Sequence, residues 1–272
     1  MFRIAWMNFR KWGSSCRVGM VLASVLVFTF IRTDPVRTLA KGLGLSVTPY
    51  FFPFQMADGI TRLLFYFALI LLLCDAPFTD SQQMQVMIRA GRKRWFMGQI
   101  LYVFLASAVY FLVVAAASVV LFVPYVAPSC RWGSVLIACA EGNGLTETYI
   151  PDVIIKSYTP VRACLLSYGI NTGIGTLLGL LIFLGNMFQS RIFGPAMAMG
   201  WVLFSNIGAW TYVKAVGYIS PVNWAGLTMF HDGEFGISYG YAAAFLSVGC
   251  AFLSALILRR ARHYNIEALE EI

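Results

Sequence analysis

The stretch WFMGQILYVFLASAVYFLVVAAASVVLFV, residues 95–123, contains no charged side chain and few polar ones. An α-helix rises about 1.5 Å per residue, so a helix of this length exceeds the roughly 30 Å hydrocarbon core of a bilayer. A water-soluble domain would have to bury such a helix on all sides. We therefore predict that residues 95–123 form a membrane-spanning helix, which decides the class of fold.

The rest of the chain has the same character. Of its 272 residues, 59% are hydrophobic and only 12% are charged, and the mean hydropathy is +0.73. Apolar runs recur along the chain, separated by segments that contain charged residues, Pro or Gly. We predict one all-α integral membrane domain over residues 1–272, with six spans at about 16–32, 60–76, 95–123, 161–187, 193–213 and 238–258. The first two spans are short for a bilayer, and Arg62 interrupts the second.

The distribution of basic residues predicts the orientation, because Lys and Arg tend to remain on the cytoplasmic side of a membrane. If the N-terminus is cytoplasmic, six spans also return the C-terminus to the cytoplasm. Most of the 20 basic residues then lie on that side: Arg3, Arg10, Lys11, Arg17, Arg89, Arg92, Lys93, Arg94, Arg191, Arg259, Arg260 and Arg262. This topology accounts for the net charge of +8, and no nucleic acid partner is needed to explain it.

The first 13 residues have an amphipathic pattern. Aromatic side chains recur there at helical spacing, while basic and amide residues take the other faces; the aromatic positions are Phe2, Trp6, Phe9 and Trp12. We predict a helix that lies flat on the inner membrane surface. It serves either as a plain anchor for the first span or as an elbow helix.

The predicted inner loop between the second and third spans, residues 79–94, contains a second short helix. Thr79 and Gln82 resemble a capping box, and Gly91 suits a helix end. One apolar stripe is expected among the glutamines, formed by Met84, Met87 and Ile88. Flexible Met side chains suit docking into a partner's groove, although a helix that rests on lipid would show the same pattern.

The sequence has few groups that could drive transport or catalysis. The ionisable residues near the spans lie at span ends (Arg62, Asp75, Arg162 and Arg191), so a proton relay is not expected. No phosphate-binding loop of the GxxxxGK[ST] type occurs, and the two histidines and six cysteines show no metal-ligand spacing. We expect no catalytic, cofactor or metal site in this chain, and any energy for active transport must enter through a partner.

This layout resembles the permease subunits of bacterial ABC exporters of the six-helix type-2 class, in which an elbow helix precedes six spans. The resemblance implies a bacterial cell-membrane location and a second permease subunit, identical or different. It also implies a cytosolic ATP-binding subunit that carries ATP and Mg²⁺. The loop at 79–94 would be the coupling helix that contacts this subunit, through Met84, Met87, Ile88, Arg89 and Arg92. The short inner turn at 189–191 departs from the class, because it leaves little room for a second contact.

The segment before the last span also looks like an outer region of such permeases. Residues 220–224, SPVNW, match its Ser-Pro pattern. We predict that residues 219–230 dip into the bilayer as two short helices broken at Pro221, covered by protein. Residues 48–54, TPYFFPF, are expected to form an aromatic belt at the outer interface, or in a functional version an outer gate.

Three local patterns have competing interpretations. Residues 236–240, GISYG, match the GxSxG motif of serine hydrolases, but no strand pattern surrounds them and we reject a nucleophile there. Cys130 and Cys139 share an outer segment and could form a disulfide. A glycine face in the fourth span could serve helix packing, a dimer contact or a transport pathway; it comprises Gly169, Gly173, Gly175 and Gly179.

Together these features predict a permease half that moves hydrophobic or amphipathic cargo outward. The apolar, aromatic-rich composition favours a peptide or bacteriocin-like molecule, a lipid-like molecule or a drug over ions and sugars. A passive channel or structural membrane subunit is the main alternative. An intramembrane enzyme is the third.

Overall fold

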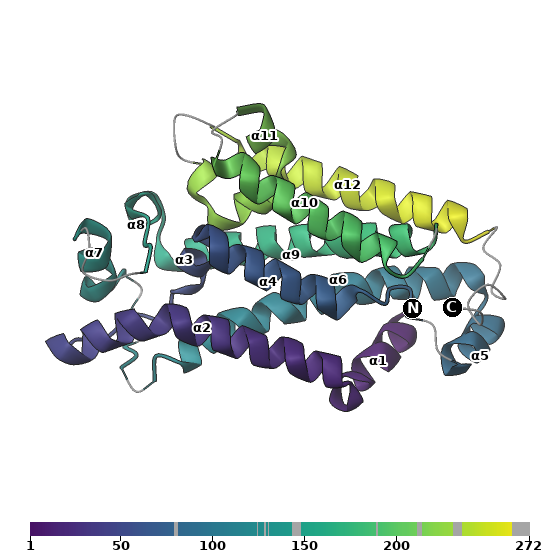
Figure 1. Cartoon of the computed structure of the whole chain (residues 1–272), viewed down its shortest axis with the longest axis horizontal. Helices are drawn as coiled ribbons and strands as arrows, with labels where there is room; N and C mark the ends of the chain where they lie inside the picture. Colours follow the sequence, from purple (N-terminus) through teal and green to yellow (C-terminus); the bar gives the residue numbers. More distant parts are fainter. Residues whose placement is uncertain are drawn as a thin grey trace.

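A computed structural model shows an elongated bundle of helices (Figure 1). It describes residues 1–78, 81–123, 125–127, 129, 131–142, 148–188, 190–210, 214–230 and 236–262, apart from the side chains of 81–84, 208–210 and 214. Within this part the only β-type pairing is an isolated bridge between Val47 and Val126. The helices are α1 (Phe2–Arg10), η1 (Trp12–Ser14), α2 (Cys16–Leu43), α3 (Phe52–Ala57), α4 (Gly59–Leu73), α5 (Ser81–Ala90), α6 (Arg92–Val120), α7 (Ser134–Glu141), α8 (Asp152–Ser157), α9 (Pro160–Asn186), α10 (Phe193–Trp210), α11 (Lys214–Ile219), η2 (Pro221–Gly226), η3 (Thr228–Phe230) and α12 (Tyr239–Arg260).

Four helices in the described part of the chain, α2, α6, α9 and α12, are long and apolar enough to cross a membrane. They coincide with the first, third, fourth and sixth predicted spans. The second predicted span corresponds to α4, an apolar helix of 15 residues, and the fifth to α10, which has 18 residues. Residues 211–213 of the fifth prediction lie outside the described residues. The prediction of an all-α chain with several helices long and apolar enough to cross a membrane is confirmed at this coarser level.

Helix α2 extends well beyond the predicted end at residue 32. It continues through Pro35 to Leu43 and ends at Gly44, which has a left-handed φ of 65°. In these added turns one face of the helix buries Val36 and Ala40, and the other faces carry charged residues. The prediction followed the apolar run and therefore stopped where the helix becomes amphipathic.

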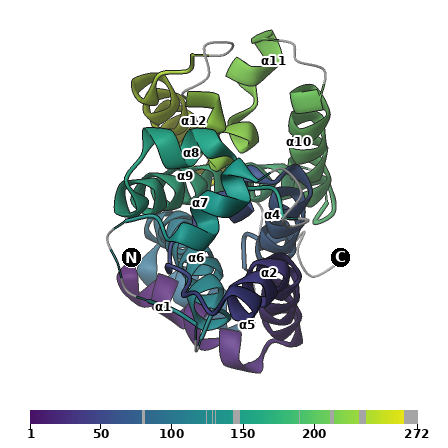
Figure 2. The same cartoon turned by 90° about the vertical axis from the view of Figure 1, so that its left-hand side faces the viewer.

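Helix α9 lies at the centre of the bundle, with α4, α6, α10 and α12 packed around it (Figure 2). In a membrane, lipid is as apolar as the side chains, so helices associate through close packing and hydrogen bonds rather than through the hydrophobic effect. Small residues on α9 allow this close approach. Asn171 and Asn186 of the same helix supply hydrogen bonds to neighbouring segments.

The glycines of α9 do not form the single face that the sequence suggested. A Cβ on Gly173 would come within 3.0 Å of Leu246 on α12. Cβ atoms on Gly175 and Gly179 would instead meet α4 and α6, the latter at 2.5 Å from Val103 Cγ1. Gly169 has no such neighbour within 4 Å. Packing inside the chain therefore accounts for three of the four glycines.

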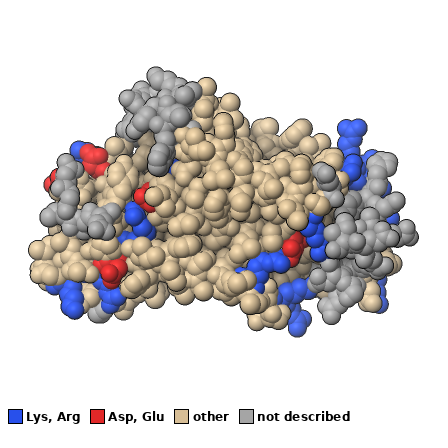
Figure 3. Space-filling model, in the orientation of Figure 1, with Lys and Arg blue, Asp and Glu red and all other residues tan. Residues whose placement is uncertain are grey.

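The two ends of the bundle differ in content. The N-terminal helix α1, helix α5 and the carboxyl end of α12 lie at one end, and α7 and α8 lie at the other (Figure 1). On the face drawn in Figure 3, charged side chains gather toward these two ends and the surface between them is mostly uncharged. We call the end with α1 and α5 the inner end, following the predicted topology.

The aromatic residues before α4 are part of the protein interior. Phe51, Phe52 and Phe54 are buried, and α3 packs against α9 and η2. Phe51 and Phe54 also contact Phe122 and Trp132. The prediction of a belt in contact with lipid is therefore wrong for these residues, because tertiary packing uses aromatic side chains as readily as the membrane interface does.

The contacts of the α9 glycines predict that the same Gly→Ala substitution changes stability by different amounts at Gly179 and Gly169. Gly179→Ala places a methyl group against Val103 and Leu73 and should destabilise the bundle by about 1–3 kcal/mol, as overpacking does. Gly169→Ala adds the same methyl group in open space and should leave stability unchanged or slightly higher. Unfolding midpoints of the purified chain in detergent measure both. Equal midpoints for the two variants would contradict this account of α9.

Candidate coupling surface and buried polar network

Helix α1 packs along α6 through Ile4, Ala5 and Asn8, a face that the aromatic pattern did not indicate. Ile4, Ala5 and Asn8 are buried, whereas Phe2 and Trp6 are 74% and 68% exposed. A Cβ on Gly98 of α6 would lie 2.8 Å from Ile4 Cβ, so this glycine allows the two helices to touch. The exposed aromatic side chains of α1 remain available to lipid.

Hydrogen bonds fasten α1 and the adjoining η1 to α6. Asn8 Nδ2 donates to Gln99 Oε1 at 2.9 Å, and both residues are buried. Trp12 Nε1 donates to Tyr102 Oη at 2.7 Å, and the ring of Phe9 stands edge-on to Tyr102 at 5.1 Å. The predicted aromatic set is thus divided: Phe9 and Trp12 belong to a contact with α6, and Phe2 and Trp6 do not.

Helix α5 spans most of the predicted coupling segment 79–94, but residues 92–94 begin α6. Gly91 separates the two helices with a φ of 81°, a backbone conformation that suits glycine. Met87 is only 5% exposed, whereas Ile88 is 80% exposed. The predicted stripe is therefore wrong for this pair, because neighbouring residues of a helix point about 100° apart. Thr79 and the side chains of Gln82 and Met84 lie outside the described residues.

Part of the predicted coupling surface is exposed among the described side chains of residues 85–92. Gln85, Ile88 and Arg89 are exposed there, and Arg92 is exposed at the start of α6. Ile88 is one of several large apolar side chains that are exposed at the inner end, together with Phe2, Trp6 and Ile192. A partner could use Ile88 as an anchor, with Arg89 beside it.

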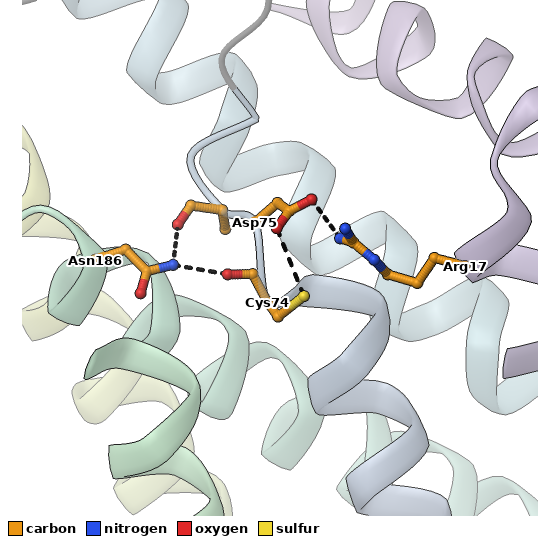
Figure 4. A network of polar contacts seen from close by, with 5 residues as sticks. Arg17, Cys74, Asp75 and Asn186 are labelled. Carbon is orange, nitrogen blue, oxygen red and sulfur yellow. Dashed lines mark hydrogen bonds and ion pairs between the residues drawn. The ribbon is translucent and has the colours of Figure 1, made fainter. Parts of the chain in front are cut away.

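The segment that leads from α4 to α5 is fastened at two points (Figure 4). Arg17, in the first turn of α2, forms an ion pair with Asp75. Asn186, at the last turn of α9, donates to the carbonyl oxygens of Cys74 at 2.8 Å and Ala76 at 2.7 Å. The side-chain oxygen of Asn186 also accepts from Gly194 N at 3.0 Å, which ties α10 to the same point.

These contacts place α5 in mechanical connection with several helices. Its leading segment is held to α2 and α9, and its own carboxyl end passes through one glycine into α6. A displacement of α5 would therefore act on α2, α6 and α9 together. The sequence places Asp75 at a span end. It contains no signal that Arg17 pairs with Asp75 or that Asn186 binds the neighbouring carbonyls.

A buried polar network lies toward the outer end, between α4, α10 and η2. Arg62 is 5% exposed, and its Nη2 donates to Asn223 Oδ1 at 3.0 Å. Asn223 Nδ2 donates in turn to Ser205 O at 2.8 Å and Ser220 Oγ at 3.0 Å. No carboxylate of the described residues lies within 4.0 Å of the Arg62 guanidinium nitrogens, so the amide oxygen of Asn223 is its identified side-chain acceptor.

Asp58 organises the start of α4 next to this network. Its carboxylate accepts from Thr61 N at 2.9 Å as the helix cap and pairs with Arg32 of α2 at 3.1 Å. One turn further, Tyr66 Oη donates to Asn171 Oδ1 at 2.8 Å. The Asp-Gly pair before an apolar run is a cap signal that sequence reading could have used. The partner residues Arg32 and Asn171 are too distant in sequence to be recognised that way.

The segment predicted at 219–230 forms short helices that the protein covers, and its position relative to a bilayer stays a prediction. Helix α11 ends at Ile219, and residues 221–227 form the short helix η2 and its cap, all of them buried. Asn171 Nδ2 and Ser167 Oγ donate to Ala225 O at 3.3 Å. Side chains of α9 therefore satisfy a carbonyl that this irregular backbone leaves unpaired. The expected break at Pro221 is confirmed.

Two other predicted features can be placed. Ser238 of the GISYG sequence caps α12, where its Oγ accepts from Tyr241 N at 3.1 Å, and the neighbouring His231 and Asp232 lie outside the described residues. Cys139 is buried in α7 and Cys130 lies outside the described residues, so their pairing stays a prediction.

The Arg62–Asn223 contact predicts an asymmetric response to mutation. Asn223→Leu leaves a buried guanidinium without its acceptor and should cost about 2–3 kcal/mol of stability. Arg62→Met removes the charge itself and should cost less, and the double variant should be more stable than Asn223→Leu alone. Unfolding midpoints in detergent test this order. A larger loss for Arg62→Met than for Asn223→Leu would refute it.

Comparison with known proteins found no matching family model, no matching curated protein and no matching solved structure.

Proposed function

We propose that this chain is the membrane-spanning permease subunit of a bacterial ABC exporter and that a separate cytosolic subunit hydrolyses ATP. In this proposal the permease works in the cell membrane as a dimer with a second permease subunit, identical or different. ATP and Mg²⁺ belong to the cytosolic subunit. Helix α5 is the element that this subunit contacts.

The observation that carries the proposal is the construction of α5. It presents Ile88, 80% exposed, on a short helix whose leading segment is held by Arg17 and Asn186 and whose end continues into α6. A helix that only rested on lipid would not need these connections. They suit an element that receives a force and passes it to the spanning helices.

The composition of the spans supports an external energy source. The sequence of α9 contains one ionisable basic residue, Arg162, in its first turn, and the apolar part of α6 contains none. Ion-coupled transporters use carboxylates or other ionisable groups near the middle of the membrane. The apolar walls of the bundle favour hydrophobic or amphipathic cargo, such as a peptide, a lipid-like molecule or a drug, and movement is outward.

A passive channel or structural membrane subunit is the second candidate. The fully buried polar network around Arg62 favours it to some degree, because such a network stabilises a fixed structure. This candidate needs no ATP-binding partner. The presence of one at α5 therefore separates the two functions.

Site-specific photo-crosslinking in the native membrane tests the proposal. A photoreactive amino acid at position 88 should form an adduct with an ATP-hydrolysing protein, because Ile88 is exposed on α5. The matched control is position 192, where Ile192 is 78% exposed on the inner turn before α10. The control should give no such adduct.

A charge substitution supplies the functional half of the test. Ile88→Asp should weaken binding of the ATPase by about tenfold or more, since a buried apolar anchor is worth ~1.5–3 kcal/mol, and transport should fall with it. Ile192→Asp should leave both unchanged. Normal ATPase binding and transport in Ile88→Asp would count against the proposal and for the channel or structural subunit.

The intramembrane enzyme makes a separate prediction. Ser238→Ala removes the candidate nucleophile and also the cap of α12, which should cost about 1 kcal/mol of stability. Ser238→Asp retains a capping side chain without a nucleophilic hydroxyl. We expect Ser238→Asp to keep full transport activity, and its loss in both variants would revive the enzyme hypothesis.

A further inference from the structure

A basic cleft opens at the inner end of the bundle, between the start of α6 and the end of α12. Its volume is about 710 Å³, and among the described residues its lining includes four cationic side chains and no carboxylate: Arg92, Lys93, Arg259 and Arg262. The remaining lining is apolar, from Ala255, Leu258 and Ala261. A concave site with several convergent cations is suited to an anion.

These four cations are not neutralised within the described part of the chain. None of them has a carboxylate within 4.0 Å there, in contrast to Arg17 and Arg32, which form ion pairs. The adjacent Arg260 does not line the cleft, since its guanidinium lies 4.4 Å from the ring centre of Phe188. The partial charges at the amino end of α6 and the carboxyl end of α12 are opposite in sign and roughly cancel. The positive potential of the cleft therefore comes from its side chains.

An apolar groove continues from this cleft toward the middle of the bundle. It has a volume of about 790 Å³ and shares Leu258 with the cleft. Its walls come from α6, α12 and the N-terminal residues Met1 and Phe2, and its floor comes from Thr176 and Leu180 of α9. The wall residues on α6 and α12 include Met97, Ile100, Leu101, Phe104, Cys250 and Ala251. We call the cleft and the groove together the α6–α12 seam.

We propose that the α6–α12 seam binds one anionic glycerophospholipid. The headgroup phosphate lies among Arg92, Lys93, Arg259 and Arg262, and an acyl chain lies in the groove. The cationic cleft matches the phosphate headgroup of such a lipid, and the apolar groove matches an acyl chain. The two parts of the seam follow each other in the same order as the two parts of the lipid. This inference does not depend on the proposed function, because a channel or structural subunit could hold the lipid equally well.

The position of the seam also favours a lipid over a soluble anion or a protein. The cations lie at the ends of two spanning helices, at the level where headgroups meet the membrane surface. The groove lies between spanning helices, where the neighbouring molecules in a bilayer are lipids. A small soluble anion would use the cleft alone and would leave the apolar groove without an occupant.

Native mass spectrometry of the full chain in detergent can measure this binding. Three probes separate the sources of affinity: phosphatidylglycerol, phosphatidylcholine with the same acyl chains, and glycerol 3-phosphate, which has no chain. Phosphatidylglycerol should bind more tightly than phosphatidylcholine, whose headgroup carries no net charge. Glycerol 3-phosphate should bind far more weakly than phosphatidylglycerol, because it cannot use the groove.

Two pairs of variants locate the site. Arg92→Gln with Arg259→Gln should weaken phosphatidylglycerol binding by roughly fivefold for each charge removed, while Arg94→Gln, on the same helix but outside the cleft, should have no effect. Ala251→Phe fills the groove and should weaken binding of the lipid by about tenfold or more. Val248→Phe, at an exposed position of α12 outside the groove, is its control.

Three outcomes would overturn the proposal. The first is equal affinity for phosphatidylglycerol and phosphatidylcholine. The second is an equal loss for the Arg94 variant and the Arg92–Arg259 variant, which would indicate general attraction to basic residues. The third is glycerol 3-phosphate binding as tight as that of the lipid, together with no effect of Ala251→Phe, which would reduce the seam to a site for a soluble anion.

Discussion

The lack of water in a bilayer core is the constraint on which the rest of this structure depends. Every backbone polar group there needs a partner from the protein, and irregular backbone is stable only where side chains supply one. Two asparagines of α9 serve this purpose. Asn171 donates to Ala225 O, and Asn186 donates to the carbonyls of Cys74 and Ala76. The central helix therefore holds the irregular segments at both ends of the bundle.

This arrangement divides the chain into a stiff outer end and a more adaptable inner end. At the outer end, η2 is enclosed by α3, α9 and α10. The buried Arg62 also donates a hydrogen bond to the side-chain amide oxygen of Asn223 in η2. At the inner end, α5 has few contacts beyond α6, and its connections are single side-chain interactions with Asp75 and the nearby carbonyls. Individual interactions of this kind open at lower free energy than a packed core does. Motion that begins at α5 can therefore proceed without disturbing η2.

The sequence predicted the spans more accurately than the contacts between them. The fourth span was expected at 161–187 and α9 runs from Pro160 to Asn186, because the Thr159-Pro160 start and a long apolar run define it locally. The end of α2 was missed since amphipathic turns follow its apolar part. The prediction of which α5 residues are exposed was also partly wrong. A periodic pattern gives the spacing of Met87 and Ile88, but it does not show which of the two is buried. The Arg62–Asn223 and Arg17–Asp75 contacts join residues far apart in the chain, and a single sequence contains no signal for such pairs.

The junction at Gly91 has a consequence for both proposals. The sequence pattern groups Arg92 with the predicted coupling residues of α5, but Arg92 belongs to α6. It lies beyond a glycine with a φ of 81° and lines the basic cleft. The surface offered by Ile88 and the seam that contains Arg92 are thus separate, yet they are joined by one residue. A lipid phosphate held by Arg92 would fix the start of α6 and so the point about which α5 turns. A lipid bound in the seam would then determine how far a displacement of α5 is passed on to α6. The lipid composition around the chain would in this way affect how the spanning helices respond to movement of α5.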